Sequence, residues 1–202
     1  MTREAKQYDS ALFWAEKWGL RNLRQTLLDE VRGLVLEIGM GTGLNLPLYS
    51  EAATVVGLDM NRERLLGSCG KHQARRPLLS QANAQQLPYA DNQFDCVVGT
   101  LVFCSIPQPE AALAEIKRVL KPDGRLFLLE HTRGHGPVSR RLTDWLHPFW
   151  FALQGECHLN RETGALVQQS GFDIAHSSVH GKGVLQMIKA APVSVDGLSR
   201  QS

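Results

Sequence analysis

The feature that most constrains the fold of this chain is an apolar run, residues 34–38, that leads directly into Gly39, Gly41 and Gly43. The run is interrupted only by Glu37, which suits a parallel strand covered on both faces. Glycines let a ligand approach the backbone closely and tolerate positive φ angles. We therefore expect a buried strand, a ligand-binding turn, and a helix that begins near Gly43 and directs its unpaired N–H groups at the ligand.

The spacing of these glycines distinguishes two classes of nucleotide site. A dinucleotide fingerprint, G-x-G-x-x-G, would require its third glycine at position 44 or 46, where this chain has Leu44 and Leu46. The pattern here is instead E-x-G-x-G-x-G, with Glu37 before the glycines. A carboxylate at this position repels a pyrophosphate but attracts an ammonium or a sulfonium. The turn therefore favours a positively charged mononucleotide cofactor over NAD.

Strands and helices alternate along the rest of the chain. This alternation predicts an α/β fold with an open, mostly parallel sheet. Strands are expected over residues 54–58, 78–82, 94–100, 125–130, 172–180 and 184–190, and helices over 61–72, 110–120, 140–153 and 161–169. The last two strands are joined by the glycine-containing turn 181–183, which indicates a hairpin.

Length and composition limit the class of protein. A chain of 202 residues suits one domain with terminal additions. We expect a helical arm over residues 1–32, a core domain over 33–191 with a His/Trp-rich insertion at 131–161, and a disordered tail over 192–202. The net charge of +2 is too small for a nucleic-acid surface. The polar N-terminus and the lack of an apolar run of about 18 residues predict a cytoplasmic location.

The four cysteines have no spacing typical of a metal site. Cys69, Cys96, Cys104 and Cys157 form no C-x-x-C pair. We therefore expect reduced thiols and no bound metal.

Two polar residues follow predicted strands and are candidates for cofactor binding. Asp59 ends the second strand 20 residues after Gly39, where an acid can accept hydrogen bonds from ribose hydroxyls. An N-cap for the next helix is the alternative role for Asp59. Asn83 ends the third strand, where its amide suits the edge of an adenine ring.

The N-terminal arm carries an aromatic cluster with more than one interpretation. Residues 4–31 have helical periodicity, interrupted at Gly19. The cluster consists of Tyr8, Phe13, Trp14 and Trp18. These side chains either pack on the domain, cover a substrate pocket, or contact a membrane surface.

The segment after residue 130 is expected to select the substrate. One helix there cannot bury all of its aromatic residues on a single stripe, so some should face a small hydrophobic substrate; they are Trp145, Phe149, Trp150 and Phe151. Candidates to stabilise a thiolate or act as a base are His131, Arg133, His147, His158 and Arg161. His131, at the end of the fifth strand, is the strongest candidate.

Several motifs occur in the order of one family. Residues 35–43, 57–59, 94–98 and 116–124 together resemble class I S-adenosylmethionine-dependent methyltransferases of the type 11, UbiE-like group. Residues 100–106, the pair Glu130-His131, and residues 148–150 and 157–162 are similar to the animal methyltransferase-like thiol methyltransferases. Residues 43–47 also resemble bacterial phospholipid N-methyltransferases.

The resemblance implies a Rossmann-like, seven-stranded sheet of order 3-2-1-4-5-7-6 with strand seven antiparallel and helices on both faces. It implies that S-adenosylmethionine, and its product S-adenosylhomocysteine, contact Glu37, Gly39, Met40, Gly41, Gly43, Asn45, Asp59, Met60, Asn83, Ala84, Thr100 and Leu101. Within this set, Gly39 and Gly41 would contact the methionine and ribose, Met60 one face of the adenine, and Thr100 and Leu101 the region beneath the sulfonium.

The predicted reaction is direct methyl transfer to a small or lipophilic acceptor, with a thiol favoured. Candidate acceptor-binding residues are Trp14, Cys104, Trp150, His158 and Arg161. Two alternatives stay open: methylation of a phospholipid or small amine, and a non-catalytic protein that binds S-adenosylmethionine.

Overall fold

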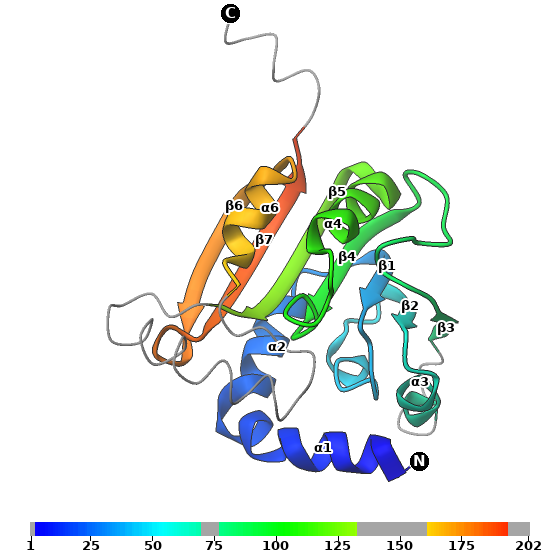
Figure 1. The fold of residues 1–202 in the computed structure, drawn as a ribbon, viewed down its shortest axis with the longest axis vertical. Helices are drawn as coiled ribbons and strands as arrows, with labels where there is room; N and C mark the ends of the chain where they lie inside the picture. Colours follow the sequence, from blue (N-terminus) through cyan, green and yellow to red (C-terminus); the bar gives the residue numbers. More distant parts are fainter. Residues whose placement is uncertain (1–2, 70–76, 133–160, 194–202) are drawn as a thin grey trace, which may run out of the picture.

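A computed structural model of the chain describes residues 3–69, 77–132 and 161–193. Its centre is a seven-stranded sheet of order β3-β2-β1-β4-β5-β7-β6 (Figure 1). The strands are β1 Gly33–Ile38, β2 Ala53–Asp59, β3 Leu78–Gln81, β4 Phe94–Thr100, β5 Leu120–His131, β6 Phe172–His180 and β7 Leu185–Pro192. The pairs among β1 to β5 are parallel, and β7 is antiparallel to both β5 and β6. The predicted fold class and strand order are confirmed.

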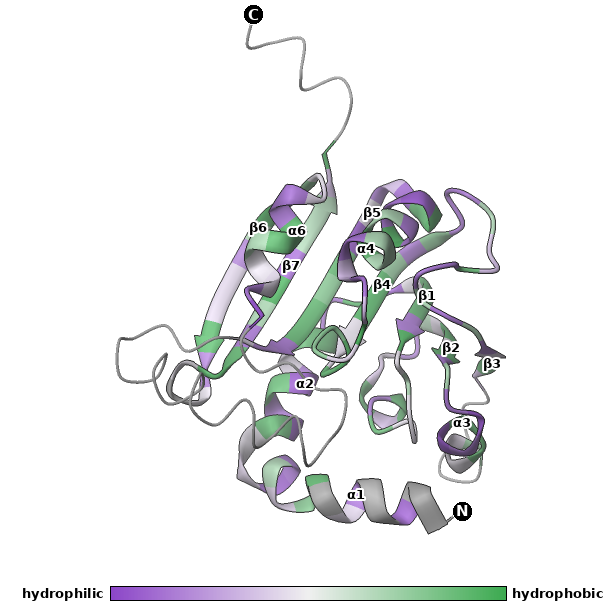
Figure 2. Ribbon diagram, in the orientation of Figure 1, coloured by the Kyte–Doolittle hydropathy of each residue, from purple (hydrophilic) through white to green (hydrophobic). Residues whose placement is uncertain are grey.

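Helices cover both faces of the sheet because its strands are apolar on both sides. The helices are α1 Arg3–Ala15, α2 Arg21–Leu28, α3 Arg62–Ser68, α4 Pro109–Val119 and α6 Thr163–Gln169. Leu36 and Leu128 belong to a buried cluster that includes the apolar side of α4. Val35 and Phe127, their neighbours along the strands, belong to a second cluster that includes α2. Figure 2 shows the resulting hydrophobic central strands between more polar helices.

The prediction of a helix that begins near Gly43 is wrong. The chain instead makes turns over residues 41–45 and one 3-10 turn at Leu46–Leu48. Gly41 and Gly43 have φ angles of 57° and 75°, which lie outside the right-handed helical region. Pro47 supplies no N–H to continue a helix, and Tyr49 is extended. The glycine turn is therefore not followed by a helix whose N-terminus could face the ligand.

Several element boundaries differ from the sequence expectation. Helix α3 ends at Ser68 and not at residue 72. Strand β5 begins at Leu120 and not at residue 125, because Leu120 pairs with Phe94. Residues 121–124 lie in a register shift between this pair and the next one, Arg125 with Cys96. Strand β7 continues to Pro192, which pairs with Phe172, so the first residue of the expected tail belongs to the sheet.

The N-terminal arm has the break predicted at Gly19. Gly19 has a φ angle of 126° and lies in a short π-helical turn, Glu16–Leu20, that joins α1 to α2. Helix α2 packs against the sheet through Leu27 and Leu28. Helix α1 runs beneath the carboxyl ends of the parallel strands (Figure 1). Within the described residues, none of the helices combines the length and the apolar character needed to cross a membrane.

Candidate functional site

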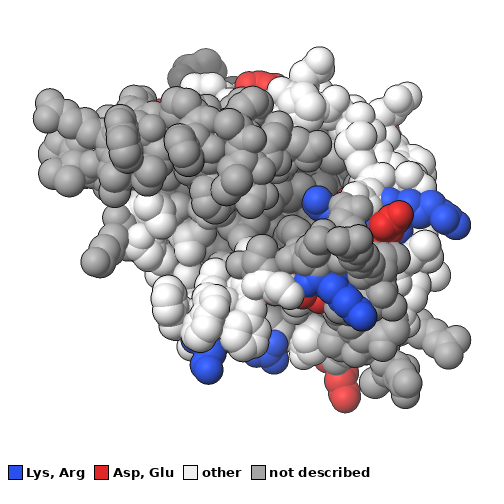
Figure 3. Space-filling view, turned by 60° about the horizontal axis from the view of Figure 1, so that its bottom comes forward, with Lys and Arg blue, Asp and Glu red and all other residues white. Residues whose placement is uncertain are grey.

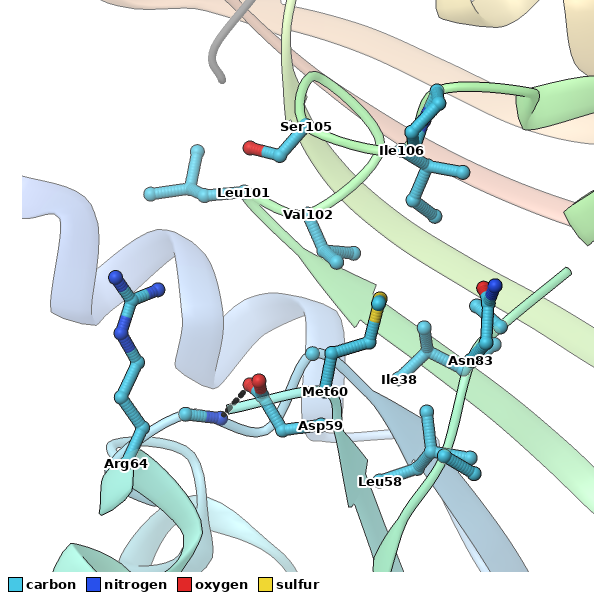
Figure 4. A pocket seen from close by; sticks show the side chains of 15 residues that line it. Ile38, Leu58, Asp59, Met60, Arg64, Asn83, Leu101, Val102, Ser105 and Ile106 are labelled. Carbon is cyan, nitrogen blue, oxygen red and sulfur yellow. Dashed lines mark hydrogen bonds between the residues drawn. The ribbon is translucent and has the colours of Figure 1, made fainter. Parts of the chain in front are cut away.

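The main pocket lies at the carboxyl ends of the parallel strands. It is next to the point where the strand order changes direction between β1 and β4, which is the usual ligand site of such sheets. The pocket spans about 730 Å³, part of which is open solvent. Figure 4 shows side chains that surround it: Ile38 at the end of β1, Leu58 and Asp59 at the end of β2, Met60 directly after β2, Asn83 after β3, and Leu101 and Val102 after β4.

Asp59 presents a carboxylate to this pocket from the end of β2. Its Oδ2 accepts a hydrogen bond from the Gly41 N–H at 2.8 Å, and its Oδ1 accepts one from the Asn61 N–H at 2.8 Å. The cap of α3 is Asn61, whose side chain accepts from the Arg64 N–H at 3.0 Å. The N-cap alternative for Asp59 is therefore wrong. The bond to Gly41 links the acid to the glycine turn and leaves further acceptor capacity for a ligand.

The glycine turn is closely packed beneath the pocket. A Cβ on Gly39 would lie 2.3 Å from Cγ2 of Val102, and the Gly39 φ angle of 64° is itself unfavourable for other residues. Val102 lines the pocket, so the wall contributed by the loop after β4 rests directly on Gly39. Only glycine satisfies both the backbone angle and this contact.

A smaller polar cavity adjoins the main pocket at Gly39. Arg24, 3% exposed, reaches it from α2. Its guanidinium donates to Asn45 Oδ1 at 3.0 Å and to Thr100 Oγ1 at 2.6 Å. The Nε of the same side chain donates to Glu16 at 2.8 Å. Arg24 therefore connects the N-terminal arm, the glycine turn and the end of β4.

Glu37 lies in the same cavity and is fully buried. It accepts hydrogen bonds from Asn45 Nδ2 at 2.9 Å and from the Tyr49 hydroxyl at 2.9 Å. Burial raises the pKa of Glu37 to about 7, although these two hydrogen bonds and nearby Arg24 act in the opposite direction. The carboxyl group can therefore gain or lose a proton near neutral pH.

A second buried acid supports the loop over residues 101–106. Oε1 of Glu130 accepts from the Val102 N–H at 3.0 Å, and burial raises the pKa of Glu130 to about 7 against the effect of three backbone N–H groups. Arg161 donates to the carbonyls of Phe103 and Ile106. Glu130 thus holds the loop through its backbone N–H groups, and Arg161 holds it through its backbone carbonyls.

The structure separates the predicted cofactor residues into three groups. The main pocket brings together Gly39, Gly41, Asp59, Met60, Asn83, Ala84 and Leu101. The smaller cavity is lined by Glu37, Met40, Asn45 and Thr100, together with Gly39. Gly43 lines neither cavity, because it packs against Leu46 and Ser68. Met40 is 4% exposed, and its thioether packs onto Gly57.

The predicted acceptor-binding residues do not line the main pocket in the part of the chain that the structure describes. Trp14 is 57% exposed on α1, and Cys104 is buried with its thiol 3.8 Å from the Leu101 carbonyl oxygen. Arg161 holds the loop over 101–106 as described above. His131 ends β5, and its buried Nδ1 has no hydrogen-bond partner among the described residues.

The remaining predictions for the segment after β5 lie outside the described residues. These are Arg133, Trp145, His147, Phe149, Trp150, Phe151 and His158. Their roles in acceptor binding stay predictions.

The sequence interpretation missed Arg24, Tyr49 and Glu130 as members of the site. Arg24 follows Leu20 by four residues and precedes Leu27 and Leu28, so it falls on the apolar side of α2. A lone arginine on a buried helical face is unusual and requires partners in the interior. The sequence therefore contained the signal that Arg24 is buried, but it did not identify the partners of Arg24.

Comparison with known proteins gives consistent matches. A family model described as "Methyltransferase domain" matches residues 36–128. A phosphatidylethanolamine N-methyltransferase from Cereibacter sphaeroides is 37% identical over 112 residues, which cover 53% of this chain and 55% of that protein. The thiol S-methyltransferase TMT1B from Rattus norvegicus is 36% identical over 148 residues, which cover 68% of this chain and 59% of that protein.

The chain thus spans between half and two thirds of the length of these two relatives. Among solved structures, the crystal structure of a SAM-dependent methyltransferase from Aquifex aeolicus matches with a TM-score of 0.63 and 20% identity, and the match covers 84% of this chain and 89% of that one. At this identity the structural match supports the fold.

Proposed function

Because this chain belongs to the class I S-adenosylmethionine-dependent methyltransferases, we propose that it transfers the methyl group of S-adenosylmethionine directly to a small or lipophilic thiol. The family match covers the cofactor-binding half of the sheet, and the acceptor must be inferred from other features.

The residues of the two cavities fit this cofactor. The carboxylate of Asp59 is suited to accept hydrogen bonds from ribose hydroxyls. Leu58 and Ile106 supply apolar walls for an adenine ring, and Asn83, whose Oδ1 is oriented by the Gln85 N–H at 2.9 Å, can donate its amide hydrogens to the ring edge. In the smaller cavity, Arg24 and Glu37 offer opposite charges to the carboxylate and ammonium of an amino acid.

Transfer to a thiol requires little covalent chemistry from the protein. When bound, S-adenosylmethionine supplies an activated methyl carbon, whose bond to the sulfonium breaks as the acceptor sulfur bonds to it, leaving S-adenosylhomocysteine. The protein has to align the acceptor and exclude water. The loop over 101–106, held by Glu130 and Arg161, forms the wall of the pocket that does so. His131, whose buried Nδ1 has no hydrogen-bond partner within the described part of the chain, is our candidate to accept the thiol proton.

One observation carries the preference for a thiol. The alignment with the rat thiol S-methyltransferase covers 68% of this chain and extends beyond the domain match at residues 36–128. Acceptor selectivity in this fold must come from residues outside the cofactor site. The alignment with the thiol S-methyltransferase includes more residues of this chain than the alignment with the phosphatidylethanolamine N-methyltransferase does.

Methylation of an amine is the alternative with specific support. The relative from Cereibacter sphaeroides, named as a phosphatidylethanolamine N-methyltransferase, is 37% identical, but its alignment covers only 53% of this chain. A non-catalytic role in binding S-adenosylmethionine is the other alternative. The cytoplasmic location predicted from the sequence stays a prediction.

Labelled cofactor distinguishes these functions. The purified chain is incubated with S-adenosylmethionine carrying a labelled methyl group and with aliphatic thiols of increasing chain length, ethanolamine, or vesicles containing phosphatidylethanolamine. We expect labelled thioethers from the thiols. Label in the amines alone would overturn the thiol proposal, and tight cofactor binding without transfer to either class would favour the non-catalytic role.

A further inference from the structure

The end of α1 and the π-helical turn after it expose a continuous aromatic surface. Phe13, Trp14 and Trp18 are 54%, 57% and 80% exposed. The ring centroids of Phe13 and Trp14 are 5.5 Å apart, and those of Trp14 and Trp18 are 5.8 Å apart. Lys17 Nζ lies 5.8 Å from the centre of the Trp14 ring. We call Phe13, Trp14, Lys17 and Trp18 the aromatic patch. Large aromatic rings gathered in contact with water mark an interaction site.

Two acidic residues near this patch, Asp9 and Glu16, are turned toward the rest of the protein. Asp9 accepts a hydrogen bond from the Thr42 hydroxyl at 2.6 Å, and Glu16 accepts one from Arg24 at 2.8 Å. Among the side chains described over residues 6–22, the exposed charged ones are Lys6, Lys17 and Arg21. The exposed charge described around the patch is therefore basic, whereas the exposed acids Asp29 and Glu30 follow the end of α2. Figure 3, which brings the α1 side forward, shows basic side chains beside white ones at the lower left of the view and an acidic side chain farther along the lower edge.

We propose that the aromatic patch binds the surface of an anionic lipid bilayer. Tryptophan and phenylalanine rings are stable at the depth of lipid headgroups, and basic side chains beside them attract anionic lipids. Helix α1 has 13 residues, too few to span a bilayer, so it lies in the interface with its aromatic side toward the lipid. Charge complementarity favours this occupant over a neutral surface.

The position of α1 makes such binding useful for catalysis. Helix α1 lies beneath the carboxyl ends of the strands, where the main pocket also lies (Figure 1). A bilayer in contact with the patch would therefore be on the pocket side of the sheet. A lipophilic acceptor dissolved in the bilayer would reach the pocket without first crossing water. This last step depends on the proposed function, whereas bilayer binding itself does not.

Vesicle co-sedimentation of the full chain tests the proposal. Phosphatidylcholine vesicles are compared with vesicles that also contain phosphatidylglycerol, and tryptophan fluorescence is followed in parallel. We expect binding to the anionic vesicles with a blue shift in emission, and weak binding to phosphatidylcholine alone. The double variant Trp14→Ser, Trp18→Ser should lose binding to both by roughly tenfold or more. Lys17→Glu should weaken binding to the anionic vesicles alone, also by roughly tenfold.

The matched control is Val179→Ser, an exposed apolar residue on β6, which should bind vesicles as the wild type does. Equal vesicle binding by the wild type and the double tryptophan variant would overturn the proposal, as would no binding by the wild type. A dimer in light scattering that disappears in the double variant would assign the patch to a second copy of this chain instead.

Transfer to a water-soluble thiol, measured without vesicles, separates this inference from the proposed function. A chain that methylates the soluble thiol but ignores anionic vesicles refutes the membrane inference alone. A chain that binds the vesicles but methylates no thiol refutes the proposed function alone.

Discussion

Replacement of Asp59 by asparagine should weaken cofactor binding much more than it destabilises the fold. The substitution keeps the shape of the side chain but removes its charge and one of its two acceptor oxygens. A hydrogen bond to a charged group contributes about 1.5–3 kcal/mol, so loss of one such bond to a ribose hydroxyl predicts roughly 10- to 150-fold weaker binding of S-adenosylmethionine. Isothermal titration calorimetry measures this change directly.

The fold should also lose a smaller amount of stability. The carboxylate accepts from both the Gly41 and Asn61 N–H groups at 2.8 Å, whereas an asparagine oxygen can satisfy only one of them. We expect a loss of about 1 kcal/mol in the free energy of unfolding, measured with urea. Asp173→Asn, on the exposed side of β6, is the matched control and should change neither quantity. An unchanged cofactor affinity in Asp59→Asn would refute the ribose assignment.

Three further predictions concern buried titratable groups. The pKa of Glu37 is raised to about 7, and the ammonium group of the cofactor favours the ionised carboxylate. Affinity for S-adenosylmethionine should therefore rise with pH up to pH 7, by at most roughly tenfold per pH unit. Calorimetry of Glu37→Gln should show no such pH dependence. Burial raises the pKa of Glu130 from 4.5 to about 7, so its stabilising effect is complete below pH 4.5 and is lost as the pH rises to 7. The free energy of unfolding of the wild type, measured with urea, should therefore fall over this pH range by about 2–3 kcal/mol more than that of Glu130→Gln. An identical pH profile in the variant would contradict the assignment. His131→Ala should lower the turnover number with thiols by roughly 10²-fold or more while cofactor affinity stays within about twofold, and an equal loss of both would argue against a role in proton transfer.

Local patterns were sufficient to predict most of the secondary structure. Strands with apolar residues on both faces gave a strong signal, and β4 was predicted with the bounds that the structure has. The hairpin around residues 181–183 was equally clear, because a glycine turn joins antiparallel neighbours. The strand order came from the family resemblance, since periodicity alone contains no information about which strands pair.

The glycine turn shows where local patterns fail. The glycine spacing predicted a turn at the ligand site, and Gly39 and Gly41 do line the main pocket, but a helix after Gly43 requires right-handed φ angles that Gly43 does not adopt. The packing of Val102 on Gly39 and the bond from the Gly41 N–H to Asp59 determine the path of the backbone here. Both partners are distant from the turn in the sequence, because Asp59 ends β2 and Val102 lies in the loop after β4.

By itself, the sequence determined the α/β class and placed two polar residues, Asp59 at the end of β2 and Asn83 after β3, at one pocket. Its preference for a positively charged ligand stays a prediction. The tertiary structure alone decided that Glu37 is buried with Asn45 and Tyr49, and that Arg24 joins the arm to the site. The physical reason is sequence distance, because Arg24 bonds to residues 21 and 76 positions away, Asn45 and Thr100. Periodicity records which side of an element is buried, but only the assembled fold determines which polar groups meet there.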